Sequence, residues 1–487
     1  MNGSAGAAVA AAPVAAAAPV RAAVAGRFAG LAVFAGCTGV ATASLVLPAL
    51  LGFDPWVWLI WGREALRGAL ATDGSVAWKP LPVLVTAPAA VFGDAAPALW
   101  AVVVRACGLF GVVLVVRLAA RIAAPRGRAV AGIVAGAAFL LTPDAESRWV
   151  RHALQANIEP VIVMCCLWAV ERHLDGRRWQ ALLLICAAAL ARPEAWPFLG
   201  LYAGWLLWCE RRRWWWAAPA VLAVLAAVPV LWFAGDRLVS GHPLSGAVVA
   251  QVLTASTPTQ RWLLAIENIA ACVIAPVWVA AAVCVVWAAH LRRGLPAALA
   301  ACALLWAAEV AVMAGVFGYA ALGRFLAPVS AVLCVLGGVA AGWVVTVPRP
   351  VLLRAAVAVG LAGVAVPFAA PRVAWLPLQL QHAEERSAYE RDLYAVVAAL
   401  GGRERMLACG NIAIDTVRPA VEVRPAITYR LDVPLSAITH TPGPGTTIAQ
   451  VGSPLHAAMR QRSAGDVVLV ARTARWAVYT ESCGSPG

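Results

Sequence analysis

The sequence predicts a polytopic α-helical membrane protein with a small α/β domain at its C-terminal end. Of the 487 residues, 62% are hydrophobic and only 13% are charged, which is far from the composition of a soluble domain. Apolar runs long enough to cross about 30 Å of hydrocarbon recur along the chain, with arginine clusters between them. From about residue 372 onward, short strand-like runs and polar helices replace the long apolar runs.

The N-terminal segment, residues 1–26, contains little besides Ala, Val, Pro and Gly, and we expect it to be a disordered leader. The apolar run that follows, near 28–50, is too long for the apolar core of a signal peptide, so it is expected to be an uncleaved first span. Arg21 and Arg27 precede this span and hold its start inside the cell. Asp54 therefore emerges on the outer side.

The membrane domain is predicted to cover residues 27–371. Its apolar runs and arginine clusters together predict about eleven spans, near 28–50, 97–118, 129–142, 158–171, 179–191, 195–209, 214–235, 262–289, 295–317, 324–346 and 351–370.

The loops that this topology places inside are strongly basic, as the positive-inside rule requires. They contain Arg21, Arg27, Arg117, Arg121, Arg126, Arg128, Arg172, Arg177, Arg178, Arg211, Arg212, Arg213, Arg292, Arg293, Arg349 and Arg354. Only Glu171, Asp175 and Glu210 oppose them. Loop charges that orient helices thus explain most of the net charge of +14, and we expect the partner to be the lipid bilayer and no nucleic acid.

Residues 372–487 are expected outside the membrane as an α/β domain. Ala383 to Leu400 has charges on one side, as a helix would; Met406 to Cys409, Asp466 to Ala471 and Ala474 to Thr480 favour strands, and Thr441 to Gly445 is a loop.

The twelve cysteines show no spacing typical of a metal site, and ten lie in or beside apolar segments. The other two, Cys409 and Cys483, lie in the polar tail. In an oxidising compartment they would form a disulfide, although two unrelated thiols remain an alternative.

Two short stretches after the first span organise the chain: Gly52 to Trp58, which contains Asp54, and Trp78 to Pro82, which contains Lys79. Lys79 is the only lysine among 38 basic residues, which indicates a position where a compact ammonium is needed, unless the choice is chance. Asp54 precedes a proline and is also a typical helix N-cap. Within the outer-face segment 51–96, the tryptophan-rich stretch Pro55 to Gly68 predicts a helix lying in the headgroup plane.

Other charged residues gather on the same predicted outer side, where charges of both signs favour a polar cavity opening outward. Asp144, Glu146, Arg148 and Arg151 precede the fourth span, and the two arginines are three apart, so they share a helix face. For each of these arginines, snorkelling to lipid headgroups is the alternative to binding a ligand.

Two further segments carry charged candidates. Arg192 and Glu194 lie in a tight outer turn, where an ion pair that stabilises the turn is the alternative to a catalytic role. Arg324 opens the tenth span from outside, as an arginine that clamps a phosphate would, with headgroup snorkelling again the alternative.

The order of these motifs resembles the GT-C glycosyltransferases, above all the aminoarabinose transferase and protein O-mannosyltransferase group. The resemblance is carried by the acid after the first span, the helix that follows it and Lys79-Pro-Leu-Pro82, and it covers roughly residues 28–345. Leu190-Ala-Arg-Pro-Glu194, Tyr319 to Pro328, and Asp236 to Leu244 with His242 are similar to segments of such proteins.

This resemblance implies a polyprenyl-phosphate sugar donor and transfer with inversion. It implies that Asp54 is the base toward the acceptor and that Lys79, with Arg324, binds the donor phosphate; Arg148 and Arg151 are further phosphate candidates. Arg192, Glu194 and His242 are expected to support the site.

A divalent metal ion is left open by the same resemblance. Many relatives carry a second acid directly after the first, where this chain has Pro55. The candidate metal ligands are therefore Asp54, Asp144 and Glu146.

We therefore expect a multi-pass plasma-membrane glycosyltransferase that moves a sugar from a polyprenyl phosphate to a hydroxyl of a lipid, glycan or protein acceptor outside the cytoplasm. A flippase or transporter of lipid-linked sugars is the alternative, although the chain shows no internal repeat of the kind common in transporters. A non-catalytic assembly subunit is a third hypothesis.

Overall fold

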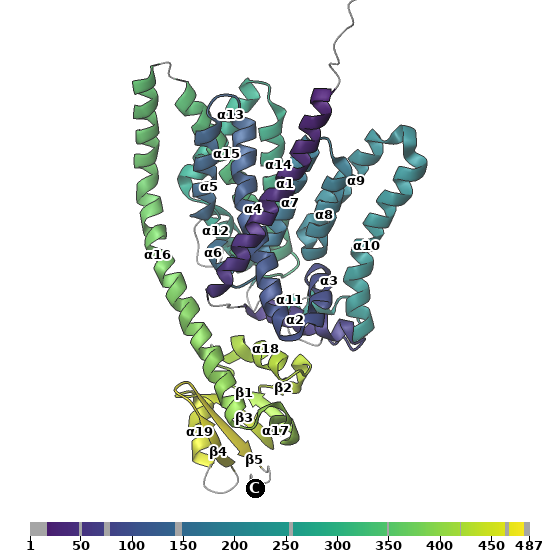
Figure 1. Cartoon of the computed structure of the whole chain (residues 1–487), viewed down its shortest axis with the longest axis vertical. Helices are drawn as coiled ribbons and strands as arrows, with labels where there is room; N and C mark the ends of the chain where they lie inside the picture. Colours follow the sequence, from purple (N-terminus) through teal and green to yellow (C-terminus); the bar gives the residue numbers. More distant parts are fainter. Residues whose placement is uncertain are drawn as a thin grey trace, which may run out of the picture.

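The computed structural model has an elongated shape, with a helix bundle at one end and a small sheet domain at the other (Figure 1). It describes residues 17–47, 51–72, 78–141, 149–252, 257–347, 350–418, 420–462 and 467–481. The leading part of the predicted leader lies outside these residues. Helix α1 begins at Ala17, so it extends into the predicted leader, where the run of alanines favours a helix.

The elements of the bundle follow the order of the chain. They are α1 (Ala17–Ala43), η1 (Ser44–Val46), α2 (Phe53–Leu66), α3 (Pro80–Ala89), η2 (Ala90–Ala95), α4 (Ala96–Ala123), α5 (Arg128–Leu140), α6 (Trp149–Leu154), α7 (Glu159–Leu174), α8 (Arg178–Ala191), η3 (Pro193–Ala195), α9 (Trp196–Cys209), η4 (Arg211–Arg213), α10 (Trp214–Ser240), α11 (Ser245–Val252), α12 (Pro258–Ala271), α13 (Ala275–His290), α14 (Gly294–Gly315), η5 (Gly323–Leu326) and α15 (Ala327–Thr346).

Within the described residues, five helices are long and apolar enough to cross a membrane, or six if the bent pair α12 and α13 forms one span. The predicted polytopic helical class is confirmed, whereas the count of eleven stays a prediction. The predicted span 262–289 is not one helix, because α12 and α13 meet at a bend of 77°. Pro276 lies at the start of α13, where a proline is tolerated, whereas inside a continuous helix it would remove a hydrogen bond.

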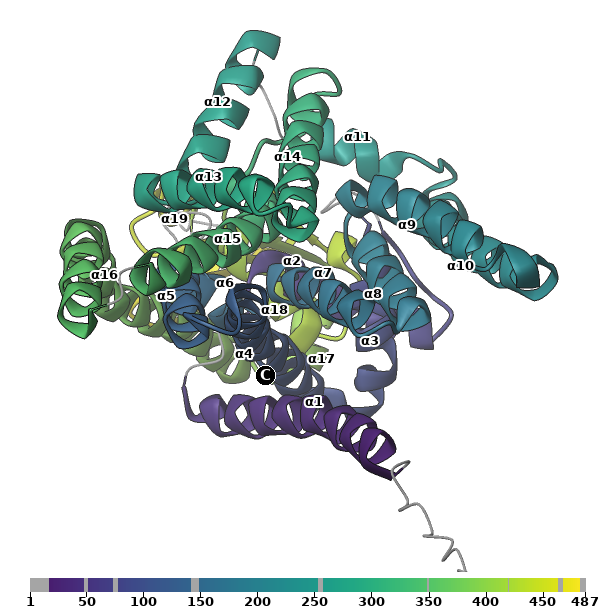
Figure 2. The same ribbon diagram turned by 90° about the horizontal axis from the view of Figure 1, so that it is seen from above.

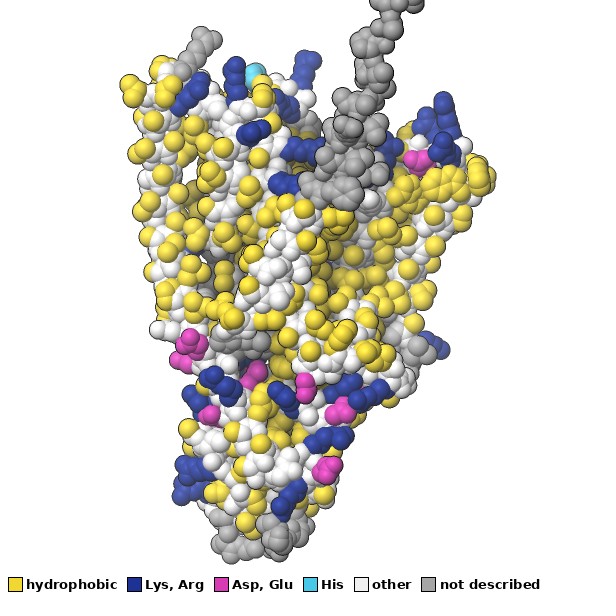
Figure 3. Space-filling view, in the orientation of Figure 1, with side chains coloured by type: hydrophobic (Ala, Val, Ile, Leu, Met, Phe, Trp, Pro, Cys, Tyr) yellow, Lys and Arg dark blue, Asp and Glu magenta, His cyan; other side chains and the backbone are white. Residues whose placement is uncertain are grey.

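Charge divides along the long axis of the molecule (Figure 3). Basic side chains gather at the end of the bundle away from the small domain, an apolar surface covers the middle, and charges of both signs lie where the small domain meets the bundle. A bundle whose small domain lies outside the cell would have this distribution. The side of the membrane itself stays a prediction.

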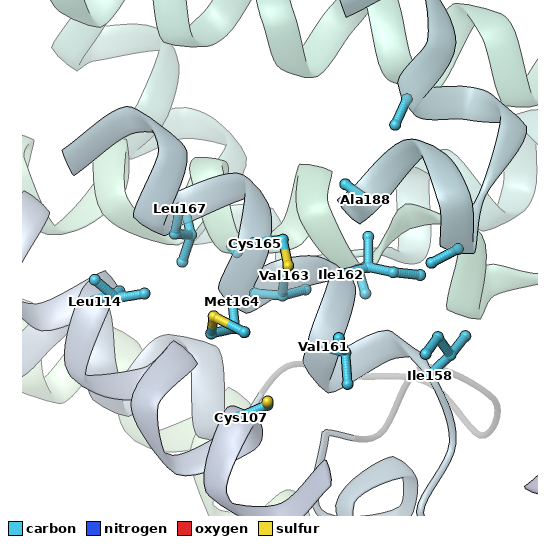
Figure 4. Close-up of a cluster of buried hydrophobic side chains, with 14 of the residues drawn as sticks. Cys107, Leu114, Ile158, Val161, Ile162, Val163, Met164, Cys165, Leu167 and Ala188 are labelled. Carbon is cyan, nitrogen blue, oxygen red and sulfur yellow. The ribbon is translucent and has the colours of Figure 1, made fainter. Parts of the chain in front are cut away.

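The bundle is held together by close packing of apolar side chains. Figure 4 shows side chains of α7, including Val163, Met164 and Leu167, lying between α4, which contributes Cys107 and Leu114, and α8. Small residues bring other helices closer still: a Cβ at Gly338 of α15 would lie 2.4 Å from the Ala131 carbonyl oxygen of α5. Such close approach is how helices associate where no water drives them together.

Helix α16 (Val351–Ala399) connects the bundle to the small domain and stands at the edge of the bundle (Figure 2). The sequence predicts a boundary near 372, between a span and a separate helix, but one continuous helix of 49 residues covers both. Pro367, Pro371 and Pro377 each remove a backbone hydrogen bond, yet the helix continues through them.

The small domain contains α17 (Gly402–Ala408), β1 (Asn411–Ile414), α18 (Ala420–Arg430), η6 (Leu435–Ala437), β2 (Ile438–Thr439), β3 (Gly445–Gln450), α19 (Pro454–Arg462), β4 (Val467–Arg472) and β5 (Trp476–Glu481). The strand order is β2-β1-β3-β5-β4, with β2, β1 and β3 parallel and β5 antiparallel to both of its neighbours. The predicted α/β class and the two last strands are confirmed.

One strand prediction is wrong. Met406 to Cys409 lies mostly in α17, because a short apolar run does not distinguish a strand from one buried helical turn. Cys409 is disulfide-bonded. Its predicted partner, Cys483, lies outside the described residues, so the pairing itself stays a prediction.

Candidate active site

Helix α2 carries Asp54 in its first turn, at the junction between the bundle and the small domain. The N-cap of α2 is Gly52, so the prediction that Asp54 is the cap is wrong; a carboxylate in the first turn still interacts favourably with the helix dipole. The Gly52 amide donates to the Gln155 carbonyl oxygen at 2.8 Å, and a Cβ at Gly52 would lie 2.8 Å from Asn157 Oδ1. Glycine thus lets α2 begin against the segment that precedes α7.

The rest of α2 is buried in protein, which corrects the prediction of a helix lying in the headgroup plane. Trp56, Trp58 and Trp61 are between 0% and 6% exposed, because α3 covers one side of the helix and α18 of the small domain covers another. Contact with α3 is close: Thr86 Oγ1 donates to the Trp58 carbonyl oxygen at 2.8 Å, and Gly62 leaves no room for a Cβ beside Thr86. Asp54 is therefore carried by a rigid element.

Lys79 is the N-cap residue of α3 and directs its ammonium toward Asp54. The distance from Lys79 Nζ to Asp54 Oδ2 is 3.6 Å, and the ammonium lies 5.1 Å from the ring centre of Trp58. The side chain is only 12% exposed. Burial lowers the pKa of Lys79 below its ordinary value, although the nearby Asp54 carboxylate opposes this effect.

Arg324, in η5, reaches the same carboxylate from another part of the chain. Its NH2 group lies 3.6 Å from Asp54 Oδ2, and its Nε lies 3.9 Å from Glu159 Oε1. Asp54 thus has two cations at ion-pair distance but beyond normal hydrogen-bond range. The structure brings Asp54, Lys79 and Arg324 together, as the sequence predicts.

Glu159, the first residue of α7, lies in the middle of this cluster and was not among the predicted site residues. It is 2% exposed, and its Oε1 accepts a hydrogen bond from Arg192 NH2 at 2.5 Å. Its Oε2 faces His152 Nδ1 at 3.8 Å. The sequence offered one signal, an acid and a proline opening an apolar span, but that pattern is also typical of an ordinary helix start.

Arg192 and Glu194 complete the cluster, in the turn between α8 and α9. Arg192 NH1 lies 3.7 Å from Glu194 Oε1, so the ion pair expected in this turn is present. The Arg192 guanidinium also stacks on Phe325, 3.9 Å from the ring centre, beside Arg324. Three cations and three carboxylates therefore alternate along one chain of contacts, and their charges balance.

Two of the other predicted residues, Arg151 and His242, are described, and both are exposed. Arg151 is on the exposed side of α6, although its neighbour His152 faces Glu159. His242 is exposed just beyond α10, and its carbonyl oxygen accepts a hydrogen bond from Ser245 Oγ at 3.0 Å. Asp144, Glu146 and Arg148 lie outside the described residues.

The charges around Asp54 do not suit a metal ion. Its neighbours at ion-pair distance are Lys79 and Arg324, which would repel a cation. No group of three or more His, Cys, Asp or Glu side chains with metal-binding geometry occurs in the described part of the chain. Asp144 and Glu146, the other two candidate ligands, lie outside the described residues, so the metal site stays a prediction and no chemical step is derived through it.

The chain resembles known proteins in its fold rather than in its sequence. No protein-family model matches the chain, and no curated protein matches it. Two solved structures of ArnT from Cupriavidus metallidurans, one bound to undecaprenyl phosphate and one in the apo state, match it with a TM-score of 0.53. Each match covers 95–96% of this chain and 98% of the ArnT chain.

The chain has the ArnT fold. Because the sequence identity is 15%, the match describes the fold alone. The predicted fold, a helical membrane bundle with a small α/β domain, is confirmed, and the likeness to ArnT extends over the small domain as well as the bundle.

Proposed function

We propose that this protein is a membrane glycosyltransferase that moves a sugar from a polyprenyl-phosphate donor to an acceptor hydroxyl outside the cytoplasm, with inversion at the anomeric carbon. The observation that carries the proposal is the Asp54 carboxylate, held 3.6 Å from both Lys79 Nζ and Arg324 NH2. A base and two phosphate-binding cations are the groups that such a transfer requires. The ArnT fold supports the same class of reaction.

The donor phosphate would bind to Lys79 and Arg324. When the bond from sugar to phosphate breaks, negative charge grows on the phosphate oxygens, and cations aimed at them stabilise the transition state. Each well-placed donor contributes roughly 3–4 kcal/mol to such stabilisation. Undecaprenyl phosphate, which is bound in one of the two ArnT structures, has the chemistry that this pair of cations would recognise.

Asp54 would accept the proton of the acceptor hydroxyl as the oxygen attacks the anomeric carbon. General-base catalysis of this kind contributes at least about 100-fold. In the resting protein both cations neutralise Asp54, and because neither is within hydrogen-bond range, a bound phosphate can draw them away. Phosphate binding would thereby release the carboxylate to act as a base. Attack opposite the leaving phosphate, in one displacement, gives inversion.

Glu159 and Arg192 would hold the phosphate-binding cation Arg324 in place. Glu159 Oε1 contacts the guanidinium groups of both Arg192 and Arg324, and the Phe325 ring centre lies 3.9 Å from the first guanidinium and 5.8 Å from the second. Buried opposite charges of this kind keep one arrangement only while all partners are present. We expect loss of Glu159 to make the positions of both arginines less well defined, although Arg192 keeps Glu194 and Arg324 keeps Asp54 as partners.

The test is to purify the protein from its native membrane and identify co-purified lipid by mass spectrometry, then to supply the corresponding polyprenyl-phosphate sugar in nanodiscs. We expect a polyprenyl-phosphate lipid to co-purify and turnover to release polyprenyl phosphate. Binding without release, together with movement of the lipid-linked sugar across a vesicle membrane, would favour the transporter hypothesis. Absence of any polyprenyl-phosphate binding would overturn the proposal.

A further inference from the structure

The small domain is attached to helix α2, which carries Asp54, by hydrogen bonds from a buried arginine. Arg63, 9% exposed, donates from NH1 to the Tyr429 carbonyl oxygen at 2.8 Å and from NH2 to the Val433 carbonyl oxygen at 3.1 Å. Both acceptors belong to the end of α18 and the turn after it. A guanidinium that donates to two carbonyl oxygens in this way fixes both the distance and the relative orientation of α2 and α18.

Asp432 lies between Tyr429 and Val433 in the sequence, and its carboxylate adds ion pairs to the contact. Its Oδ1 is 2.9 Å from Arg63 NH1, and its two carboxylate oxygens accept hydrogen bonds from Arg67 at 2.7 and 3.1 Å. The backbone of Asp432 has a φ of +52°, a conformation that Asp and Asn tolerate better than most residues. The turn thus presents the carboxylate to Arg63 in the last turn of α2 and to Arg67, the C-cap residue of that helix.

A second contact joins the small domain to η2, the segment that follows α3. Lys79 is the N-cap residue of α3. Tyr429 Oη donates to the Gly93 carbonyl oxygen of η2 at 3.0 Å, while its ring packs 5.4 Å from that of Trp56. The end of α18 therefore contacts α2, which carries Asp54, and η2, which follows the helix that Lys79 caps. Their partner Arg324 lies in η5, which packs with α12, α14 and α15 inside the bundle.

We propose that Asp432 is a positioning residue: by holding Arg63 and Arg67 it sets the position of α2, and hence the distance from Asp54 to Arg324. The inference rests on the proposed role of Asp54. Arg63 follows Asp54 by nine positions on one helix, about 13 Å along its axis, so a helix of this length moves as a rod. A displacement of about 1 Å at reacting groups can cost about 100-fold in rate.

The decisive variant is Asp432→Asn, which retains the left-handed backbone preference and the size of the side chain but loses its charge. Its matched control is Asp392→Asn. Asp392 accepts a hydrogen bond from Arg475 at 2.7 Å, the same distance as the Arg67–Asp432 contact, but both partners belong to the small-domain end of the chain. The control therefore removes a comparable ion pair without touching α2.

Three quantities are measured for each full-length variant in nanodiscs. They are the kcat for release of polyprenyl phosphate from the donor that co-purifies, the Kd of undecaprenyl phosphate, and hydrogen exchange of the amides in residues 53–66 and in α7. For Asp432→Asn we expect a kcat lowered between about 10-fold and 100-fold, faster exchange in α2 but not in α7, and a Kd close to that of the wild type. For Asp392→Asn we expect wild-type kcat and wild-type exchange in α2.

Equal effects of the two variants on kcat would overturn the inference, because the loss would then reflect general weakening of the small domain. Faster exchange in α2 with unchanged kcat would also overturn it. If the wild-type protein neither binds undecaprenyl phosphate nor turns over, the proposed function fails instead. Exchange in α2 would then still decide whether Asp432 holds the helix.

Discussion

Replacement of Asp54 by Asn separates its role as a base from its electrostatic role, because the amide has nearly the same shape and no charge. At the effective dielectric typical near a protein surface, opposite charges about 4 Å apart attract by about 4 kcal/mol before the cost of desolvation is subtracted. Asp54 has two such partners, Lys79 and Arg324, each at 3.6 Å, and it competes with a donor phosphate for both. Loss of the carboxylate leaves three cations facing two carboxylates.

We therefore expect opposite effects on binding and turnover. In Asp54→Asn the Kd of undecaprenyl phosphate should stay the same or decrease, because the competing carboxylate is gone. The kcat for release of polyprenyl phosphate should fall at least about 100-fold, because no base accepts the acceptor proton. Hydrogen exchange in α2 should match the wild type, since Gly52 rather than Asp54 caps the helix.

The assay is donor turnover and equilibrium lipid binding in nanodiscs, with Asp94→Asn as the control. The Asp94 side chain is 90% exposed in η2, so its loss removes a carboxylate from the same end of the bundle without altering the cluster. A kcat for Asp54→Asn within a few-fold of the wild type would refute the base assignment. Weaker lipid binding in this variant would refute the competition between Asp54 and phosphate.

Four further outcomes are expected. Lys79→Ala should weaken undecaprenyl phosphate binding and lower kcat together. Lys79→Arg should restore neither fully, because the larger, planar guanidinium does not fit the buried space that the compact ammonium occupies beside Asp54. Steady-state kinetics with lipid titration would show this, and wild-type behaviour of Lys79→Arg would contradict it. The disulfide of Cys409 should close on Cys483 and stabilise the small domain by roughly 4–5 kcal/mol in the chain-entropy model; non-reducing peptide mass spectrometry tests the pairing, and a free Cys483 thiol would exclude it. Burial raises the pKa of Asp432, but the hydrogen bond from Arg67 and the charge of Arg63 outweigh this effect, so the net pKa is lowered. The ionised Asp432 carboxylate therefore stabilises the folded protein above about pH 4, and this stabilisation is lost as pH falls through the folded-state pKa. In Asp432→Asn the melting temperature should consequently fall less steeply at acid pH than in the wild type. A cysteine replacing the exposed Arg418 should react with an impermeant thiol reagent in intact cells, and labelling only after permeabilisation would place the small domain inside.

The sequence predicts the class of fold and the site residues Asp54 and Lys79, because both predictions depend on local patterns. Apolar length and arginine placement identify a helical membrane protein, and the positions of Asp54 and Lys79 after the first span are visible as unusual residues in short motifs. Whether they meet depends on the packing of α3 against α2, which the sequence does not display. The interaction between Asp54 and Arg324 joins residues far apart in the chain.

Two features of the site could not be predicted from the sequence. In each, a segment far away in the chain buries residues whose local pattern is typical of an exposed position. The tryptophans of α2 form a pattern typical of a headgroup-facing helix, but α18 of the small domain covers them. Glu159 at the start of α7 resembles a solvated helix end until Arg192 and Arg324 are placed beside it. In both cases long-range contacts decide the environment, and local periodicity contains no record of them.

Helix α16 makes the small domain sensitive to the thickness of the bilayer. One end of this helix is apolar and exposed, as expected of a span that faces lipid, and its other end is built into the core of the small domain through Leu393 and Val396. A continuous helix of 49 residues is about 74 Å long, and a spanning helix answers a thinner bilayer by tilting. Because α18 is anchored to α2, a tilt of α16 would pull the small domain against that anchor. Membranes or detergents of different hydrophobic thickness would therefore strain the contact between α18 and α2. The force would come from the tilt of α16 and not from a bound ligand.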